Sequence, residues 1–323
     1  DAITSTRRRV TPCRASCEPM SRPLRIGHQL SARIEGDPVA AAVRAEELGF
    51  DAVLAADHVG SGWAPMPMLA TIAALTRRVR LGTLVLNNDM RNPVQLAWEA
   101  STIDRLSGGR FELGLGAGHT PSEYEATGLE RSAPADRKRR LAESVEIVRA
   151  LVDGEAVDHD GEHYRVDGAR IDRALQERLP ILVGGNGAGL LGHAGRHADI
   201  VGLQGVGRTR EDGHSHEVTW STRHLDEQIA QVRAGAGARF DDVEFNALVQ
   251  VVQITDERDA ALARVVERVA GLTMDDAEST PYLLIGTADE IVGHMMACNE
   301  RWGISYFAVR DLDGFEPVIR ALR

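Results

Sequence analysis

Short apolar runs alternate with amphipathic segments along most of the chain. Each run is rich in Val, Leu, Ile and Ala and has the length of a buried strand, whereas the segments between runs carry apolar residues at helical spacing. Buried strands that alternate with helices are typical of a parallel sheet covered by helices. The predicted strands are residues 24–30, 51–59, 79–88, 111–118, 179–187, 199–205, 243–255 and 304–312.

Eight strand–helix repeats in a chain of 323 residues predict a closed (β/α)8 TIM barrel, with an open doubly wound sheet as the alternative. Residues 23–323 are assigned to one barrel domain, and residues 1–22 to an N-terminal extension that is expected to be disordered. Residues 155–171 alternate around a turn at Asp160–Gly161, which predicts a β-hairpin inserted outside the barrel. A polar loop is predicted from the end of the sixth strand to about residue 219.

Composition narrows the classes of protein that the chain can belong to. Hydrophobic residues make up 43% of it, enough for a packed core, and no run reaches the length of a membrane-spanning helix. The formal net charge of −11 argues against a nucleic-acid surface, which needs clustered positive charge. Cys13, Cys17 and Cys298 do not make a metal quartet, and the sequence predicts a cytoplasmic protein with reduced thiols.

Polar residues at predicted strand ends are the candidates for chemistry, because a barrel builds its active site at the carboxyl ends of its strands, here called the mouth. Asp57 and His58 follow the second strand. A histidine there can move a proton near neutral pH, whereas Asp57 could equally cap a helix. His119 and Glu123 follow the fourth strand and can act as acid or base, although Glu123 could simply complement a helix dipole. Further polar residues at strand ends are His28, Gln204 and Arg310.

Two glycine-rich stretches have different interpretations. Gly114, Gly116 and Gly118 alternate at the end of the fourth strand, and the third glycine comes one residue too early for the G-x-G-x-x-G dinucleotide fingerprint. Crowded backbones are the competing explanation for these glycines. Residues 184–189, GGNGAG, end the fifth strand and open a helix, whose free N–H groups favour a phosphate, with a tight turn as the alternative.

The motifs of several other chemistries are missing from the sequence. His193 and His197 lie one helical turn apart, but the glutamate of H-E-x-x-H is absent, so they predict a surface pair and no metal site is predicted. Neither a G-x-S-x-G elbow nor P-loop or EF-hand spacing occurs.

Three stretches together resemble the bacterial luciferase-like monooxygenase superfamily, over about residues 24 to 312. They are AEELGFDAVLAADHV, RVRLGTLVLNNDMRNPVQLAWEASTIDRLSGGRFELGLGAG and LPILVGGNGAGLLGHAGRHADIVGL. The resemblance implies a (β/α)8 barrel with insertions that binds FMN or the deazaflavin coenzyme F-420. The ADH at the end of the second strand is similar to the F-420-dependent branch, whereas the FMN branch tends to have a Glu-His pair there.

The resemblance also implies roles for individual residues. His58 matches a histidine near the reactive edge of the deazaflavin. Leu84–Val85 matches a strand-three bulge, often a cis non-proline peptide, that supports the ring from behind, and Asn87 matches a polar residue that contacts the ring. With Asp57 and Gly118 they form the predicted coenzyme site. The residues that match the loop holding the coenzyme phosphate are Gly184, Gly185, Asn186 and Gly187.

The function that the resemblance implies is transfer of a hydride between coenzyme F-420 and a small organic molecule, with His58, His119 and Glu123 as candidate catalytic residues. The superfamily's sugar-phosphate dehydrogenase has a glutamate where His119 stands and uses lysines for its substrate. Since Lys138 is the only lysine here, glucose 6-phosphate is disfavoured. The alternatives are an FMN-dependent luciferase-like monooxygenase and a ligand-binding barrel with little turnover. The resemblance also implies a homodimer.

Overall fold

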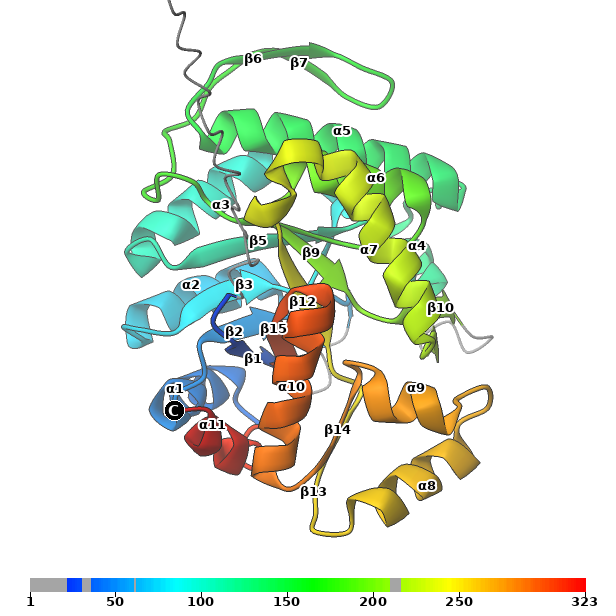
Figure 1. The fold of residues 1–323 in the computed structure, drawn as a ribbon. Helices are drawn as coiled ribbons and strands as arrows, with labels where there is room; N and C mark the ends of the chain where they lie inside the picture. Colours follow the sequence, from blue (N-terminus) through cyan, green and yellow to red (C-terminus); the bar gives the residue numbers. More distant parts are fainter. Residues whose placement is uncertain (1–21, 31–35, 61, 210–215) are drawn as a thin grey trace, which may run out of the picture.

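The computed structural model describes residues 22–30, 36–60, 62–209 and 216–323. Its main sheet contains β1 (Arg25–Leu30), β2 (Ala52–Ala55), β3 (Arg80–Thr83), β4 (Leu86–Asn87), β5 (Phe111–Gly116), β8 (Ile181–Gly184), β9 (Ile200–Leu203), β12 (Glu244–Leu248) and β15 (Ile304–Val309). The strand order is β3-β2-β1-β15-β12-β9-β8-β5-β4, and β3 also pairs with β5, which closes the ring. Because β3 and β4 are successive parts of one strand position, the sheet is the predicted (β/α)8 barrel rather than an open sheet (Figure 1).

Helices follow the barrel strands and cover the outside of the ring (Figure 1). Local sequence sets their ends: α1 begins at Pro38 after the Asp37 carboxylate, which accepts a hydrogen bond from the Val39 N–H at 2.8 Å, and it ends at Gly49. The described helices are α1 (Pro38–Leu48), α2 (Pro65–Leu75), η1 (Asn88–Met90), α3 (Pro93–Ser107), α4 (Pro121–Thr127), α5 (Pro134–Val152), α6 (Ala188–His197), α7 (Thr222–Ala236), η2 (Gly237–Asp242), α8 (Arg258–Arg268), α9 (Met274–Ser279), α10 (Ala288–Trp302) and α11 (Glu316–Leu322).

Two antiparallel strand pairs lie outside the barrel. β6 (Val157–Asp160) and β7 (Arg165–Ala169) pair within the segment that was predicted to form a hairpin, and this pair lies beyond α5 in Figure 1. β10 (Val206–Thr209) pairs with β11 (His216–Val218), so the prediction of a polar loop to about residue 219 was wrong. The polar composition hid this pair, because backbone groups rather than apolar side chains form the hydrogen-bond ladder.

The predicted seventh strand, residues 243–255, is two strands in different sheets. β12 ends at Leu248, and β13 (Val251–Ile254) pairs with β14 (Leu283–Gly286), a strand that is not among those predicted from the sequence. The chain changes partners between them: the Val249 N–H donates to the Ala308 carbonyl, whereas the Gln250 N–H donates to the Tyr282 carbonyl, each at 2.9 Å. The apolar alternation continues across this change and therefore could not mark it.

The amino-terminal end of the barrel is closed by a basal cluster of Arg25, Arg80, Glu112 and Glu244. The Arg25 guanidinium binds Glu112 at 2.8 Å and Glu244 at 2.7 Å, and Arg80 pairs with the same Glu112. Arg25 also lies 3.8 Å from the ring centroid of Tyr306. Burial alone would raise the pKa of Glu112, but the fields of Arg25 and Arg80 outweigh it and the pKa is lowered.

An apolar layer separates the basal cluster from the mouth. Because successive strand residues face opposite sides, alternate residues point into the barrel and the others pack under the helices. The interior layer consists of Ala52, Leu54, Leu84, Leu182, Ile200, Leu248, Tyr306 and Ala308.

Residues 1–21 of the predicted N-terminal extension lie outside the described residues. Arg22 is bound to the barrel domain, since its side chain donates to the Asp241 carbonyl at 2.8 Å and its own carbonyl accepts from Asn299 at 3.0 Å.

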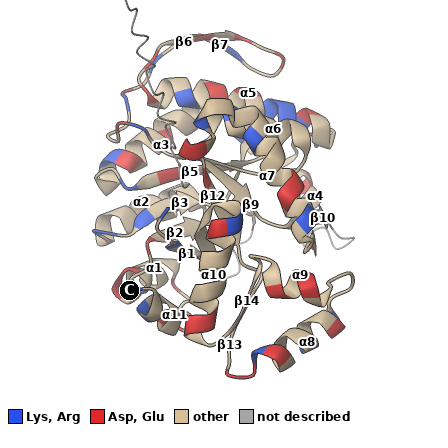
Figure 2. Cartoon of the chain, in the orientation of Figure 1, with Lys and Arg blue, Asp and Glu red and all other residues tan. Residues whose placement is uncertain are grey.

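Acidic and basic positions both occur along α5 (Figure 2). In the described part of the chain, no helix combines the length and hydropathy that a bilayer crossing needs.

Candidate active site

Two histidines and a glutamate meet at the mouth. His58 follows β2, and its Nδ1 lies 2.7 Å from Oε1 of Glu123, a buried residue in the first turn of α4. His119, which follows β5, places its ring centroid 6.0 Å from that of His58 with the rings edge to face. The structure therefore brings together the three residues that were predicted from the sequence to be catalytic. A carboxylate on Nδ1 fixes the imidazole's orientation and leaves Nε2 for another partner.

Asp57 connects the ends of two strands rather than capping a helix. Its Oδ2 accepts hydrogen bonds from the Asn87 backbone N–H at 2.8 Å and from Arg91 Nη1 at 2.6 Å. The helix α2 starts only at Pro65 and has Ala64 as its N-cap. Asp57 therefore positions Asn87 through the backbone, which explains why a buried carboxylate stands beside His58.

The peptide bond between Leu84 and Val85 is cis, as the resemblance implied. It joins β3 to β4, and its Leu84 carbonyl accepts a hydrogen bond from Gln29 Nε2 at 3.0 Å. Val85 packs where β5 and β8 carry glycine: a Cβ built on Gly116 would lie 2.6 Å from Val85 Cγ2, and one on Gly184 would lie 3.1 Å from Val85 Cγ1. Close contacts, and not a dinucleotide turn, thus account for the glycines of β5: the Thr83 carbonyl would lie 1.8 Å from a Cβ on Gly114, and the Val85 side chain occupies the space beside Gly116.

Asn87 contains a buried polar atom without a partner. The side chain is 6% exposed, and its Oδ1 accepts from the Asp89 N–H at 3.0 Å. Its Nδ2, by contrast, has no hydrogen-bond partner among the described residues. Buried donors without an acceptor are rare in native proteins, because each one lowers the stability of the fold by about 1–3 kcal/mol. A ligand with an acceptor group at the mouth would satisfy it.

The glycine loop, residues 184–187, joins β8 to α6. Gly187 is the N-cap of α6 with a φ of 97°, and no side chain caps the helix, so its first N–H groups are available to an anion. Lys138 Nζ lies 3.0 Å from where a Cβ on Gly187 would stand. The only lysine of the chain, which was not among the site residues predicted from the sequence, therefore reaches this loop from α5. The feature of the sequence that could have indicated this role is a lysine near the start of the helix α5.

Two histidine predictions need correction. His28 does not face the mouth, because Gly27 and Gln29 occupy the inward positions of β1. It is 5% exposed, its ring lies 5.7 Å from that of Phe50, and burial lowers its pKa to about 4.

His193 is not a surface residue either: it is 6% exposed and stacks on His197 at 4.4 Å. Glu146 of α5 lies 3.6 Å from His197 and 3.9 Å from His193. Burial, followed by the charges of His197 and Arg196, lowers the pKa of His193 to about 4.

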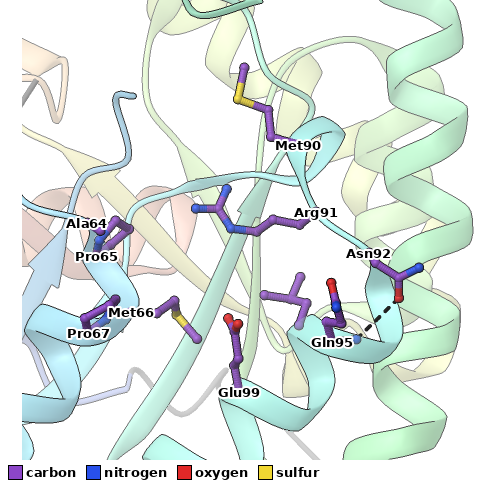
Figure 3. A pocket seen from close by; sticks show the side chains of 10 residues that line it. Ala64, Pro65, Met66, Pro67, Met90, Arg91, Asn92, Gln95 and Glu99 are labelled. Atoms are coloured by element: carbon purple, nitrogen blue, oxygen red, sulfur yellow. Dashed lines mark hydrogen bonds between the residues drawn. The ribbon is translucent and has the colours of Figure 1, made fainter. Parts of the chain in front are cut away.

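A cavity of about 300 Å³ lies beside the mouth, between the start of α2 and the η1–α3 segment (Figure 3). Arg91 is the only one of its lining residues that touches the candidate site, through Asp57. None of the predicted catalytic or coenzyme residues lines this cavity, so we do not assign it to the active site. Its lining residues are Ala64, Pro65, Met66, Pro67, Met90, Arg91, Asn92, Gln95, Leu96 and Glu99.

The fold and the polar residues at its mouth define a (β/α)8 barrel of the kind that carries an active site at the carboxyl ends of its strands. A family model described as luciferase-like monooxygenase matches residues 35–291, and the chain belongs to this family.

Relatives of known function share part of the chain. It is 37% identical over 187 residues to the F-420-dependent glucose-6-phosphate dehydrogenase of Nakamurella multipartita, a match that covers 55% of each chain. It is 34% identical over 245 residues to the protein of the same name from Nocardia farcinica, covering 72% of this chain and 70% of that one. The chain thus spans about half the length of the first of these relatives.

Solved structures share the fold at lower identity. An F-420-dependent secondary alcohol dehydrogenase in complex with an F-420–acetone adduct has a TM-score of 0.71 at 20% identity, covering 94% of this chain and 100% of that one. The EDTA monooxygenase of Chelativorans sp. BNC1 has a TM-score of 0.72 at 15% identity, covering 93% and 94%. Dehydrogenases and monooxygenases therefore have this same fold, which does not by itself distinguish between them.

Proposed function

We propose that the protein is an oxidoreductase that transfers a hydride between coenzyme F-420 and a small organic substrate. The observation that carries this proposal is the 34% identity to an F-420-dependent dehydrogenase over 72% of the chain. The residues at the mouth fit a ring-shaped coenzyme, because Asn87 offers an unsatisfied donor, and Gly116 and Gly184 allow Val85 to pack between β5 and β8 below the ring. When bound, the deazaflavin supplies the hydride chemistry, so the protein needs few reactive groups.

The coenzyme ring would lie among the residues at the ends of β2, β3 and β5. Leu84 and Val85 would support one face, with the Leu84 carbonyl held by Gln29. Asn87 would donate its free Nδ2 hydrogen bond to the ring, and Asp57 keeps Asn87 in place. Gly118 allows this approach, since a Cβ there would lie 2.3 Å from Asn87 Oδ1.

The coenzyme phosphate would bind at the glycine loop, formed by Gly184, Gly185, Asn186 and Gly187. The uncapped N-terminus of α6 offers N–H donors, and Lys138 adds a positive charge beside Gly187. Gln228 Nε2 donates to Asn186 Oδ1 at 2.9 Å and so fixes the loop from α7. Because Lys138 would serve this loop, it would not be available to a second phosphate site.

Proton transfer would involve the histidine pair. Glu123 orients His58 through the 2.7 Å contact, so that His58 can hydrogen-bond near the reactive carbon of the coenzyme. His119 stands 6.0 Å from His58 and is the candidate for moving the substrate proton. A histidine suits this task because its unperturbed pKa of about 6.5 is close to working pH.

Titration of the purified protein with F-420 and with FMN, each in both redox states, tests this function. Quenching of F-420 fluorescence without FMN binding supports the proposal. Retention of FMN with oxygen-dependent turnover identifies a monooxygenase instead, an alternative that the fold shared with monooxygenases keeps open. Binding of neither cofactor, together with tight binding of another ligand, identifies a binding protein with little turnover.

We also infer a cytoplasmic homodimer that associates through α2 and α3. These neighbouring helices expose the apolar side chains of Leu75, Trp98 and Leu106, each more than half exposed at 57%, 66% and 59%. A Trp98→Glu, Leu106→Glu variant is expected to have a monomer mass in light scattering, whereas the unmodified chain has a dimer mass. A monomer mass for the unmodified chain at micromolar concentration would exclude this dimer, and cell fractionation tests the compartment.

A further inference from the structure

Arg310 stands at the mouth at the end of β15, the strand that closes the ring against β1. The strand register pairs Gly27 with Ala308, so Gln29 and Arg310 are neighbours two residues further along. Ala308 belongs to the interior apolar layer, and Arg310 therefore takes the next inward position above it. The Arg310 side chain is exposed to solvent, whereas Gln29 is buried.

Two hydrogen bonds fix the Arg310 guanidinium relative to the proposed coenzyme site. Arg310 Nε donates to Gln29 Oε1 at 2.9 Å, and Gln29 Nε2 donates to the Leu84 carbonyl at 3.0 Å. Gln29 thus uses one end of its amide for each partner. Because Nε makes this contact, the two Nη groups of Arg310 remain available, and neither donates to any residue in the described part of the chain.

Among the described residues, Arg310 lacks the carboxylate partner that Arg25, Arg80 and Arg91 each have. Arg25 and Arg80 share Glu112, and Arg91 at the mouth pairs with Asp57 at 2.6 Å. No carboxylate within the described ranges forms an ion pair with Arg310. Desolvation by the surrounding protein lowers the pKa of Arg310, because it destabilises the charged guanidinium. An anionic ligand would stabilise that charge again.

We propose that Arg310 binds an anionic group of the substrate, a carboxylate or a phosphate, through its two Nη groups. This proposal rests on the proposed function. The coenzyme also carries anionic groups, but its phosphate is proposed at the glycine loop after β8. In the ring, β9 and β12 lie between β8 and β15, so Arg310 and the glycine loop are on different sides of the mouth. The anion at Arg310 therefore belongs to the substrate.

Calorimetric titration with inorganic phosphate and with succinate, at low salt and with the protein saturated with F-420, tests this site. Arg310→Gln keeps a donor for Gln29 but removes the charge, and we expect it to weaken binding of both anions by about ten- to a hundredfold. Arg310→Lys keeps the charge and should retain part of the affinity. Arg170→Gln is the matched control, because Arg170 is exposed next to β7 and makes no ion pair with a described residue. The affinity for F-420, measured by fluorescence quenching, is expected to be unchanged in all three variants.

Two results would overturn the proposal. Equal anion affinity of the Arg310→Gln variant and the parent protein would show that Arg310 is only a solvated surface residue. A loss of F-420 affinity in Arg310→Gln, with anion binding unchanged, would assign Arg310 to the coenzyme. If no variant and no parent protein binds F-420, the proposed function fails, and the same anion titrations on the coenzyme-free protein still decide whether Arg310 binds anions.

Discussion

The two ends of the barrel differ in how their charged side chains are paired. At the amino-terminal end, every charged side chain of the basal cluster has an oppositely charged partner, and Glu112 receives two arginines. Among the described residues at the mouth, Arg310 has no carboxylate partner and Asn87 Nδ2 has no hydrogen-bond partner. Buried polar atoms without a hydrogen-bond partner occur at both ends, because Glu112 Oε2 and the Tyr306 hydroxyl also lack one among the described residues. The contrast between the ends therefore lies in the pairing of charge. The paired charges of the amino-terminal end contribute to the fold, whereas the unpaired charge at the mouth is suited to binding a ligand.

The largest effect is expected from breaking the closed end. Glu112→Gln keeps the shape of the side chain but leaves Arg25 and Arg80 without their shared carboxylate. Removing one partner of a buried ion pair typically costs about 3–5 kcal/mol, so the free energy of unfolding, measured in urea, should fall by this amount. The affinity of the folded variant for F-420 should not change, because the apolar layer separates the cluster from the mouth.

Arg165→Gln is the matched control, since it breaks an exposed ion pair with Asp160 and should change stability by no more than the error of the measurement. An equal loss in both variants would show that the basal cluster contributes no more than a surface pair does.

Glu112→Gln should also change how the stability of the protein depends on pH in acid. The folded pKa of Glu112 is lowered, so its contribution to stability is complete above the unfolded pKa of about 4.5 and is lost as the pH falls through the folded value. The stability of the parent protein should therefore decrease more steeply below pH 4.5 than that of Glu112→Gln, and the two curves should converge. Parallel curves would show that Glu112 titrates alike in both states.

Substitutions at the mouth should lower activity with little loss of stability. His119→Ala is expected to lower kcat by about 10²–10⁴, as for a lost general acid or base, and to leave F-420 affinity nearly intact. His58→Ala should weaken F-420 binding and turnover together, because His58 is proposed to contact the coenzyme. Steady-state kinetics with a verified substrate and fluorescence titration separate the two. Full activity of His119→Ala over a range of pH would show that water or another residue supplies the proton.

Gly185→Asp tests whether the glycine loop binds the phosphate. Repulsion between the new carboxylate and the phosphate should cost about a hundredfold in F-420 affinity. Bulk contributes as well, since a Cβ on Gly185 would lie 2.5 Å from Leu190 Cδ2. Gly185→Asn has the same shape without the charge, so the difference between the two variants measures the electrostatic part. Equal affinity of the two variants would place the phosphate elsewhere.

The barrel could be predicted from the sequence, but several features of its mouth could not. Periodicity identified the eight strand positions, since buried parallel strands are apolar throughout. It did not separate β12 from β13, because the partner change at Val249 and Gln250 is a matter of backbone pairing. The predicted strand ends placed His58, His119 and Glu123 at one end of the barrel. The 2.7 Å contact between His58 Nδ1 and Glu123 Oε1, however, depends on the position of α4, which the periodicity does not give.

The direction in which a strand residue points and the contacts between distant elements could not be predicted from the sequence either. Residue parity within a strand decides whether a side chain faces the mouth, which is why His28 was misjudged. Lys138 was missed because the position of α5 against α6, and not any motif, carries its ammonium to Gly187.

The smallest expected effect concerns this lysine. Lys138→Met keeps the length of the side chain and removes the charge beside Gly187, so we expect F-420 affinity to fall by about tenfold, the value of one charge-assisted hydrogen bond. Arg139→Met is the matched control: it removes the same charge from the next residue of α5, whose guanidinium pairs with Glu162 at 3.0 Å. The loss should shrink as salt is added for a contact that is partly exposed. If both variants lose the same affinity, the effect is the general charge of α5, and Lys138 does not contact the phosphate.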